Sequence, residues 1–136
     1  MTAFLRRLRG DRGAVSTQLV VVVPLLLLLA LLVVQFALAW HARHIAQFAA
    51  QRALASARVE KGSAAEGRTQ GLRTLAALGH TILAHPSVHI DRGAARATAR
   101  VSGEVERVLP IPGLTLHASG TAEGPVEKTT LPPGGH

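Results

Sequence analysis

Cysteine is absent from the sequence, which excludes a disulfide framework and any thiol chemistry. Aromatic residues are few, and all of them (Phe4, Phe36, Trp40 and Phe48) lie in the first 48 positions. The rest of the chain therefore offers no platform on which bases or sugars can stack. The G-x-S-x-G, Walker, H-E-x-x-H and dinucleotide-binding motifs are also missing. We expect no enzymatic activity, no cofactor, no small-molecule substrate and no nucleic-acid partner.

Acidic residues are outnumbered by basic ones, and the formal net charge is +7. Residues 1–13 contain four arginines and one aspartate, which amounts to +3 and leaves +4 for the remaining chain. Much of the basic character therefore belongs to a short N-terminal leader.

One long apolar run dominates the chain. Residues 19–36 include fifteen Leu, Val and Phe residues and are interrupted only by Pro24, Ala30 and Gln35. On insertion scales these fifteen side chains favour a membrane helix by roughly 4–9 kcal/mol, and Pro24 and Gln35 do not reverse the sign. The stretch up to Trp40 gives about 33 Å of helix, which matches a bilayer core. The run predicts a single-pass transmembrane helix.

The charges on either side of the run indicate an orientation. Four arginines precede it within a few residues of one another, whereas those that follow are more widely spaced: Arg6, Arg7, Arg9 and Arg12 before, and Arg43, Arg52 and Arg58 after. Since Lys and Arg near a membrane helix stay on the cytoplasmic side, we predict a cytoplasmic N-terminus and an extracytoplasmic C-terminal part.

Beyond the membrane we expect two helical segments. Residues 41–58 are rich in Ala, Gln and Arg, so the first helix should continue to Arg58, either solvated or closely approached by another helix. Gly62 should break it, and Ser63 with Glu66 has capping-box spacing. A second helix should follow, bury one stripe of apolar residues and stop at Pro86. The stripe consists of Leu72, Leu75, Leu78 and Ile82.

The last part of the chain alternates with a period of two, as half-buried strands do. Residues 96–106 place Ala97, Ala99, Val101, Gly103 and Val105 on one face, and residues 115–126 place Leu116, Ala118, Gly120 and Ala122 on one face. Residues 87–91 predict a short third strand, and residues 109–114, with two prolines, predict a turn region.

These elements predict a membrane-anchored α+β fold: a long N-terminal transmembrane helix, a second short helix, and a small antiparallel sheet of two or three strands packed against one helix. We divide the chain into a basic leader (residues 1–13), the transmembrane helix with its extramembrane continuation (14–58), a small α+β extracytoplasmic domain (59–128) and a disordered tail (129–136).

Three pairs of polar residues are spaced closely enough to be candidate sites. Glu104 and Glu106 should share a strand face with Arg100, which is typical of solvated charge. His85 and His89 are separated by Pro86, and His41 with His44 lacks a neighbouring carboxylate or thiolate. We expect no catalytic, cofactor or metal site.

Two cleavage sites can be placed around the apolar run. One follows residues 37–39, whose Ala-Leu-Ala pattern resembles a signal peptidase site, although the run exceeds the usual length of a signal peptide. The other lies between Gly13 and Ala14, where a basic arm ends in glycine and a small polar patch leads into the apolar helix. A cut there leaves the helix as the new N-terminus.

The arrangement of residues 9–40 resembles the TadE-like family of tight-adherence (Flp-type) pilus proteins. That family typically shows a basic arm, Arg-Gly, a small-residue patch, an acidic residue at the fifth position after the glycine, a proline at the eleventh and a Leu-rich run. Counted from Ala14, Pro24 is the eleventh residue. More loosely, residues 49–57 and 121–128 are similar to later parts of family members.

The resemblance implies cleavage by a prepilin peptidase between Gly13 and Ala14, and assembly contacts at Gln18 and Pro24. It also implies three kinds of partner: the prepilin peptidase, other pilins or pseudopilins, and the inner-membrane pilus platform. The fifth position is Gln18 where the family usually has Glu. A neutral amide fits a minor pseudopilin better than a major pilin, or is simply a polar residue at the membrane surface. The alternatives are a plain single-pass anchored interaction protein, and a domain released by signal peptidase after Ala39.

Overall fold

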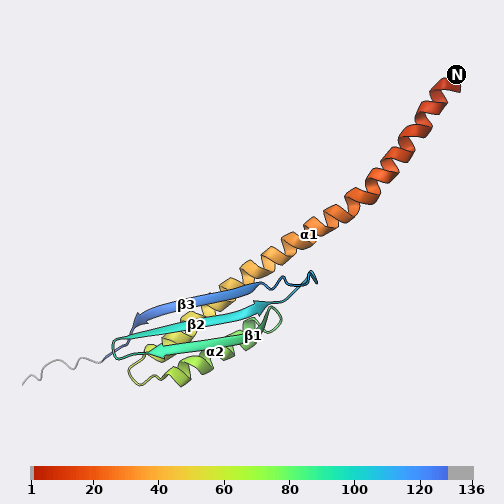
Figure 1. The fold of residues 1–136 in the computed structure, drawn as a ribbon. Helices are drawn as coiled ribbons and strands as arrows, with labels where there is room; N and C mark the ends of the chain where they lie inside the picture. Colours follow the sequence, from red (N-terminus) through yellow and green to blue (C-terminus); the bar gives the residue numbers. More distant parts are fainter. Residues whose placement is uncertain (1, 129–136) are drawn as a thin grey trace, which may run out of the picture.

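The computed structural model describes the backbone of residues 2–128 and the side chains of residues 16–128. Two helices and three strands follow one another along the chain: α1 (Thr2–Arg58), α2 (Ala64–Leu78), β1 (Leu83–Arg92), β2 (Arg96–Val105) and β3 (His117–Pro125). The predicted α+β fold with a long N-terminal helix is confirmed (Figure 1). The predicted tail, residues 129–136, lies outside the described residues.

Helix α1 is continuous over 57 residues, which corresponds to about 85 Å. It passes through Pro24 without a break, as membrane helices often do when nearby groups compensate for the missing N–H. It ends at Arg58, as predicted, and the chain then turns through a hydrogen bond from the Gly62 N–H to the Val59 carbonyl. In Figure 1 its N-terminal part projects far beyond the sheet.

Helix α2 begins with the predicted capping box. The Ser63 hydroxyl accepts from the Glu66 N–H at 3.1 Å, and the Glu66 carboxylate accepts from the Ser63 N–H at 2.9 Å. The prediction that Pro86 ends this helix is wrong. The helix ends at Leu78 because Gly79 caps it and donates its N–H to the Leu75 carbonyl at 2.7 Å.

The buried face of α2 also differs from the predicted stripe. Leu72 and Leu78 are 38% and 51% exposed, and Ile82 follows the helix. The buried residues are Gly67, Gly71, Thr74 and Leu75. A Cβ at Gly67 would lie 2.8 Å from the Ala57 Cβ, so only a residue without a side chain allows the two helices to approach this closely. Glycines that weaken α2 in isolation therefore make its contact with α1.

The sheet is antiparallel with the order β1-β2-β3. The predicted inward face of β2 is confirmed, since alternate residues from Ala97 to Val105 are buried. Strand β1 is longer than predicted and includes Pro86. It tolerates the proline because it is an edge strand and because its pairing with β2 is irregular between Ala84 and Ser87. Next to this irregularity, His85 has a positive φ of 48°.

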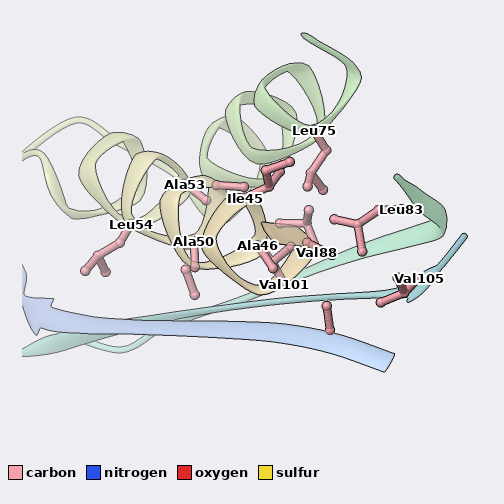
Figure 2. Close-up of a cluster of buried hydrophobic side chains, with 14 of the residues drawn as sticks. Ile45, Ala46, Ala50, Ala53, Leu54, Leu75, Leu83, Val88, Val101 and Val105 are labelled. Atoms are coloured by element: carbon pink, nitrogen blue, oxygen red, sulfur yellow. The ribbon is translucent and has the colours of Figure 1, made fainter. Parts of the chain in front are cut away.

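The prediction that the sheet packs against one helix is wrong, because both helices contact the sheet. Helix α1 contacts mainly β2 and β3, while α2 contacts α1 and β1. Figure 2 shows this core, in which small side chains of α1 face Val88, Val101 and Val105 of the sheet. A solvated helix over residues 41–58 is therefore excluded: its alanines line the interior of the chain's own fold. The fully buried ones are Ala42, Ala46, Ala49, Ala50, Ala53 and Ala57.

Candidate membrane and assembly surface

Helix α1 has two parts with different surroundings. We call residues 16–34 the exposed half and residues 35–58 the packed half. Large apolar side chains cover the exposed half: Leu19 is 54% exposed, Val20 72% and Leu27 61%. Only 6% of the most apolar 18-residue stretch of the helix is buried, whereas core helices of soluble proteins are mostly buried. By length and composition α1 can cross a membrane, and its exposed half is the surface suited to lipid or to partner helices.

The predicted assembly residues lie on this exposed half. Gln18 and Pro24 are both exposed and lie outside the hydrophobic core. They are six residues apart, which is about 9 Å along the axis and roughly 120° around it. A single straight partner helix therefore cannot contact both side chains centrally. The predicted processing residues, Gly13 and Ala14, belong to the backbone of α1, and their role stays a prediction.

Gln35 begins the packed half, and its importance was missed in the sequence. It is only 4% exposed. Its Oε1 accepts from the Val108 N–H at 2.8 Å and from the Leu109 N–H at 3.4 Å. Its Nε2 donates to the Glu106 carbonyl at 3.3 Å. The residue that interrupts the apolar run therefore joins α1 to the β2–β3 loop. A Gln within an otherwise apolar helix was the available signal.

Gln47 makes a second contact of the same kind. Its Nε2 donates to the Thr121 carbonyl at 2.9 Å, and its Oε1 accepts from the Thr121 N–H at 3.1 Å. The side chain thus pairs with β3 as a neighbouring strand would, at the edge of the sheet. Beside it, a Cβ at Gly120 would overlap backbone atoms of Ala46 and Gln47. Backbone and side-chain contacts together hold β3 against α1.

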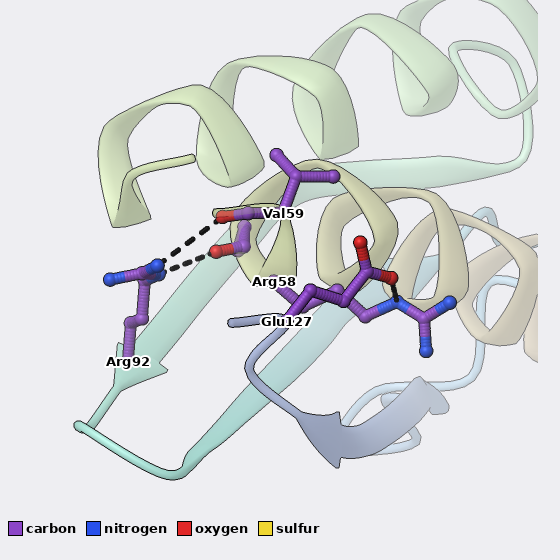
Figure 3. Close-up of polar contacts among 5 residues, drawn as sticks. Arg58, Val59, Arg92 and Glu127 are labelled. Carbon is purple, nitrogen blue, oxygen red and sulfur yellow. Dashed lines mark hydrogen bonds and ion pairs between the residues drawn. The ribbon is translucent and has the colours of Figure 1, made fainter. Parts of the chain in front are cut away.

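Polar contacts also close the end of α1 that is farthest from the exposed half (Figure 3). Arg92 donates from Nε to the Ala57 carbonyl at 2.6 Å and from Nη2 to the Val59 carbonyl at 3.3 Å. The last carbonyls of a helix have no partner within it, so these bonds cap α1. Arg58 pairs with Glu127 at 3.4 Å, and the Glu127 N–H donates to the Arg58 carbonyl at 2.8 Å.

The paired residues considered as sites are not brought together into a reactive cluster. Glu104 lies 3.9 Å from His117 Nε2 on the solvated side of the sheet, whereas Glu106 follows the end of β2. Glu106 is exposed one residue past the strand, so only Glu104 belongs to β2 itself. His44 contacts the Trp40 ring edge-on, with centroids 5.5 Å apart. Among the described residues, no group of three His, Cys, Asp or Glu side chains could bind a metal ion.

The comparisons with known proteins match the exposed half and most of the packed half. The family model described as TadE-like protein matches residues 13–54, a range that lies entirely within α1 and begins at the predicted cleavage glycine. Neither the curated proteins nor the solved structures contain a match to the chain. Over this helix the predicted resemblance is confirmed: residues 13–54 form a TadE-like segment, and the family suggests a role in the assembly of tight-adherence pili.

Proposed function

We propose that the protein is a non-enzymatic, TadE-like minor pseudopilin that helps to assemble a tight-adherence or related type IV-like pilus or secretion machine. The single observation that carries this proposal is the TadE-like match over residues 13–54. It coincides with a helix whose exposed half presents large apolar side chains and whose packed half belongs to the folded part of the chain. We call this folded part, residues 35–128, the body. A subunit of this shape can be held in a bilayer while it presents its body outside.

In this proposal α1 crosses the cytoplasmic membrane once, with the N-terminus inside and the body outside, in line with the arginine-rich leader. A prepilin peptidase removes residues 1–13, and the chain then contacts other pseudopilins and the inner-membrane platform. The proposal assigns an assembly contact to Gln18, which is the fifth residue of the chain that begins at Ala14. An amide can accept a hydrogen bond from the amine of a neighbouring subunit without adding a second buried charge.

Release after Ala39 is disfavoured by the contacts of Gln35. Cleavage there would remove Gln35 and would leave the N–H groups of Val108 and Leu109 without their partner. Each hydrogen bond lost in this way lowers stability by about 0.5–1.5 kcal/mol. Leu38 and Ala39 also pack against the core. The remaining alternative, a plain anchored interaction protein, shares the fold but requires no cleavage.

The N-terminus of the mature protein separates these functions. We expect mass spectrometry of protein purified from membranes of a host with a prepilin peptidase to show a chain that begins at Ala14. A chain that begins at Met1 would support the plain anchor, and one that begins at Trp40 would support release. Replacing Gly13 by a bulky residue should leave the longer precursor, whereas replacing Gly10 in the same way should not.

Protease added to intact spheroplasts should digest the body if the orientation is as proposed.

A further inference from the structure

We infer that the apolar middle of the β2–β3 connection, residues 108–114 and called the loop below, inserts into the outer boundary of the lipid bilayer and forms a second membrane contact beside α1. This inference rests on α1 spanning the membrane, as proposed above. The loop consists of Val, Leu, Pro, Ile and Gly residues and contains no ionisable side chain. Val108 is 37% exposed, and Ile111 and Leu114 are each 39% exposed. Leu109 is buried at 8% exposure, so Val108, Ile111 and Leu114 are the large apolar side chains of this loop that are exposed.

The position of the loop along α1 places it at membrane depth. Arg12 and Arg43 are the charged residues that flank the apolar run. They are about 46 Å apart along a helix, close to the full thickness of a bilayer with its headgroups. Gln35 lies about 12 Å from Arg43 on the membrane side. Because the loop is hydrogen-bonded to Gln35, it lies near the boundary between the headgroups and the acyl chains. Figure 1 shows the loop at the end of the sheet from which α1 projects.

Several backbone N–H groups of the loop are either absent or hydrogen-bonded within the protein, which suits an environment with little water. Pro110 and Pro112 have no N–H, and Gln35 accepts from the N–H groups of Val108 and Leu109. The Ile111 N–H donates to the Leu109 carbonyl at 2.9 Å, and the Leu114 N–H donates to the Ile111 carbonyl at 3.2 Å. An unpaired backbone donor costs several kcal/mol in lipid, so this pairing lowers the penalty for inserting an irregular segment.

The neighbouring exposed side chains agree with a lipid interface. Phe36 and Trp40, one and five residues beyond Gln35 on α1, are 68% and 69% exposed, and Trp is enriched where a membrane meets water. Charged or titratable groups stand at the two ends of the loop and not within it: Glu106 and Arg107 before it, and His117 after it. The apolar surface of the exposed half therefore continues onto the loop, which favours lipid over a soluble partner as its occupant.

Site-directed spin labelling of the full chain tests the inference. Because the protein has no cysteine, Ile111→Cys introduces a single thiol. The measurement uses phosphatidylcholine nanodiscs that contain one chain each, and it compares how often each label collides with oxygen and with a water-soluble nickel complex. The control is Lys61→Cys, which is exposed on the turn after α1. We expect the ratio of oxygen to nickel collisions to be several-fold higher at 111 than at 61. Leu28→Cys, in the middle of the span, should give an even higher ratio.

The three labels distinguish the possible failures. If the label at 28 reports lipid and the label at 111 reports water like the label at 61, the inference is wrong and the membrane span stands. If the label at 28 also reports water, the span and the proposed function fail together. If the label at 111 is shielded from both reagents, protein covers the loop and the inference is wrong. Ile111→Ser, labelled at Leu114→Cys, should lower the oxygen ratio while Gln35 keeps its partners.

Discussion

The exposed and the packed halves of α1 belong to one uninterrupted helix, yet their side chains differ in size and direction. The exposed half presents Leu and Val outward, as a helix does when the solvent is lipid. The packed half presents Ala inward, so that a sheet and a second helix can approach its backbone. The comparison teaches that two segments of one helix can have different surroundings, because the size of their side chains decides what each segment can pack against.

The close approach of β3 to the packed half gives the largest expected effect. A side chain at Gly120 must displace the backbone of α1 at Ala46 and Gln47. We expect Gly120→Ala to lower the free energy of unfolding of the body by at least about 2 kcal/mol. Urea titration of the full chain in detergent, followed by pulse proteolysis, measures this change. Gly124→Ala is the matched control on the same strand, because its Cβ would be at an ordinary 3.5 Å from Leu54. Equal effects of the two variants would contradict the close packing.

Removing the same side chain from each half contrasts them directly. Leu54 in the packed half is 8% exposed, and Leu27 in the exposed half is 61% exposed. We expect Leu54→Ala to lower the stability of the body by about 2–3 kcal/mol and Leu27→Ala to change it by less than about 0.5 kcal/mol. The same urea titration compares them. A large loss for Leu27→Ala in detergent would show that the exposed half takes part in folding.

Gln35 is the first residue of the packed half. Replacing it tests the contact between α1 and the β2–β3 loop without reducing the tendency of α1 to insert into a membrane. Gln35→Leu makes the run more apolar but removes the acceptor for the Val108 and Leu109 N–H groups. We expect the free energy of unfolding to fall by about 1–2 kcal/mol. Hydrogen exchange at these two amides should become faster, and membrane insertion should be retained. Ala37→Leu, at an exposed position two residues further on, should leave both amides protected. Unchanged exchange in Gln35→Leu would mean that the loop is held by other contacts.

Gln18 should have the smallest effect on folding and a distinct effect on assembly. Since Gln18 is exposed and distant from the body, Gln18→Leu and Gln18→Glu should change its stability by less than about 0.5 kcal/mol. Gln18→Leu should reduce co-purification with pilin-like partners from a host that makes them, whereas Gln18→Glu should preserve or strengthen it. Equal recovery with Gln, Glu and Leu would remove the assembly role of this position.

The sequence by itself determined the elements that depend on local pattern. The apolar run predicts a long helix, Ser63 with Glu66 predicts a capping box, and the alternation along β2 predicts a half-buried strand. These three local structures are confirmed, whereas the membrane span itself stays a prediction. The TadE-like segment is recognisable for the same reason, because its glycine, its proline and its Leu-rich run lie within a short stretch.

Only the tertiary structure decided which faces meet. The sequence predicts a leucine stripe as the buried face of α2, and of its leucines Leu75 is buried. Gly67 and Gly71 are buried as well, because helix packing there depends on how closely the two backbones can approach. Gln35 looked like an interruption of a membrane helix, and its partners are more than 70 residues away in the chain. Pairings over such separations depend on the whole fold, so no local pattern around Gln35 or Gly120 could reveal them.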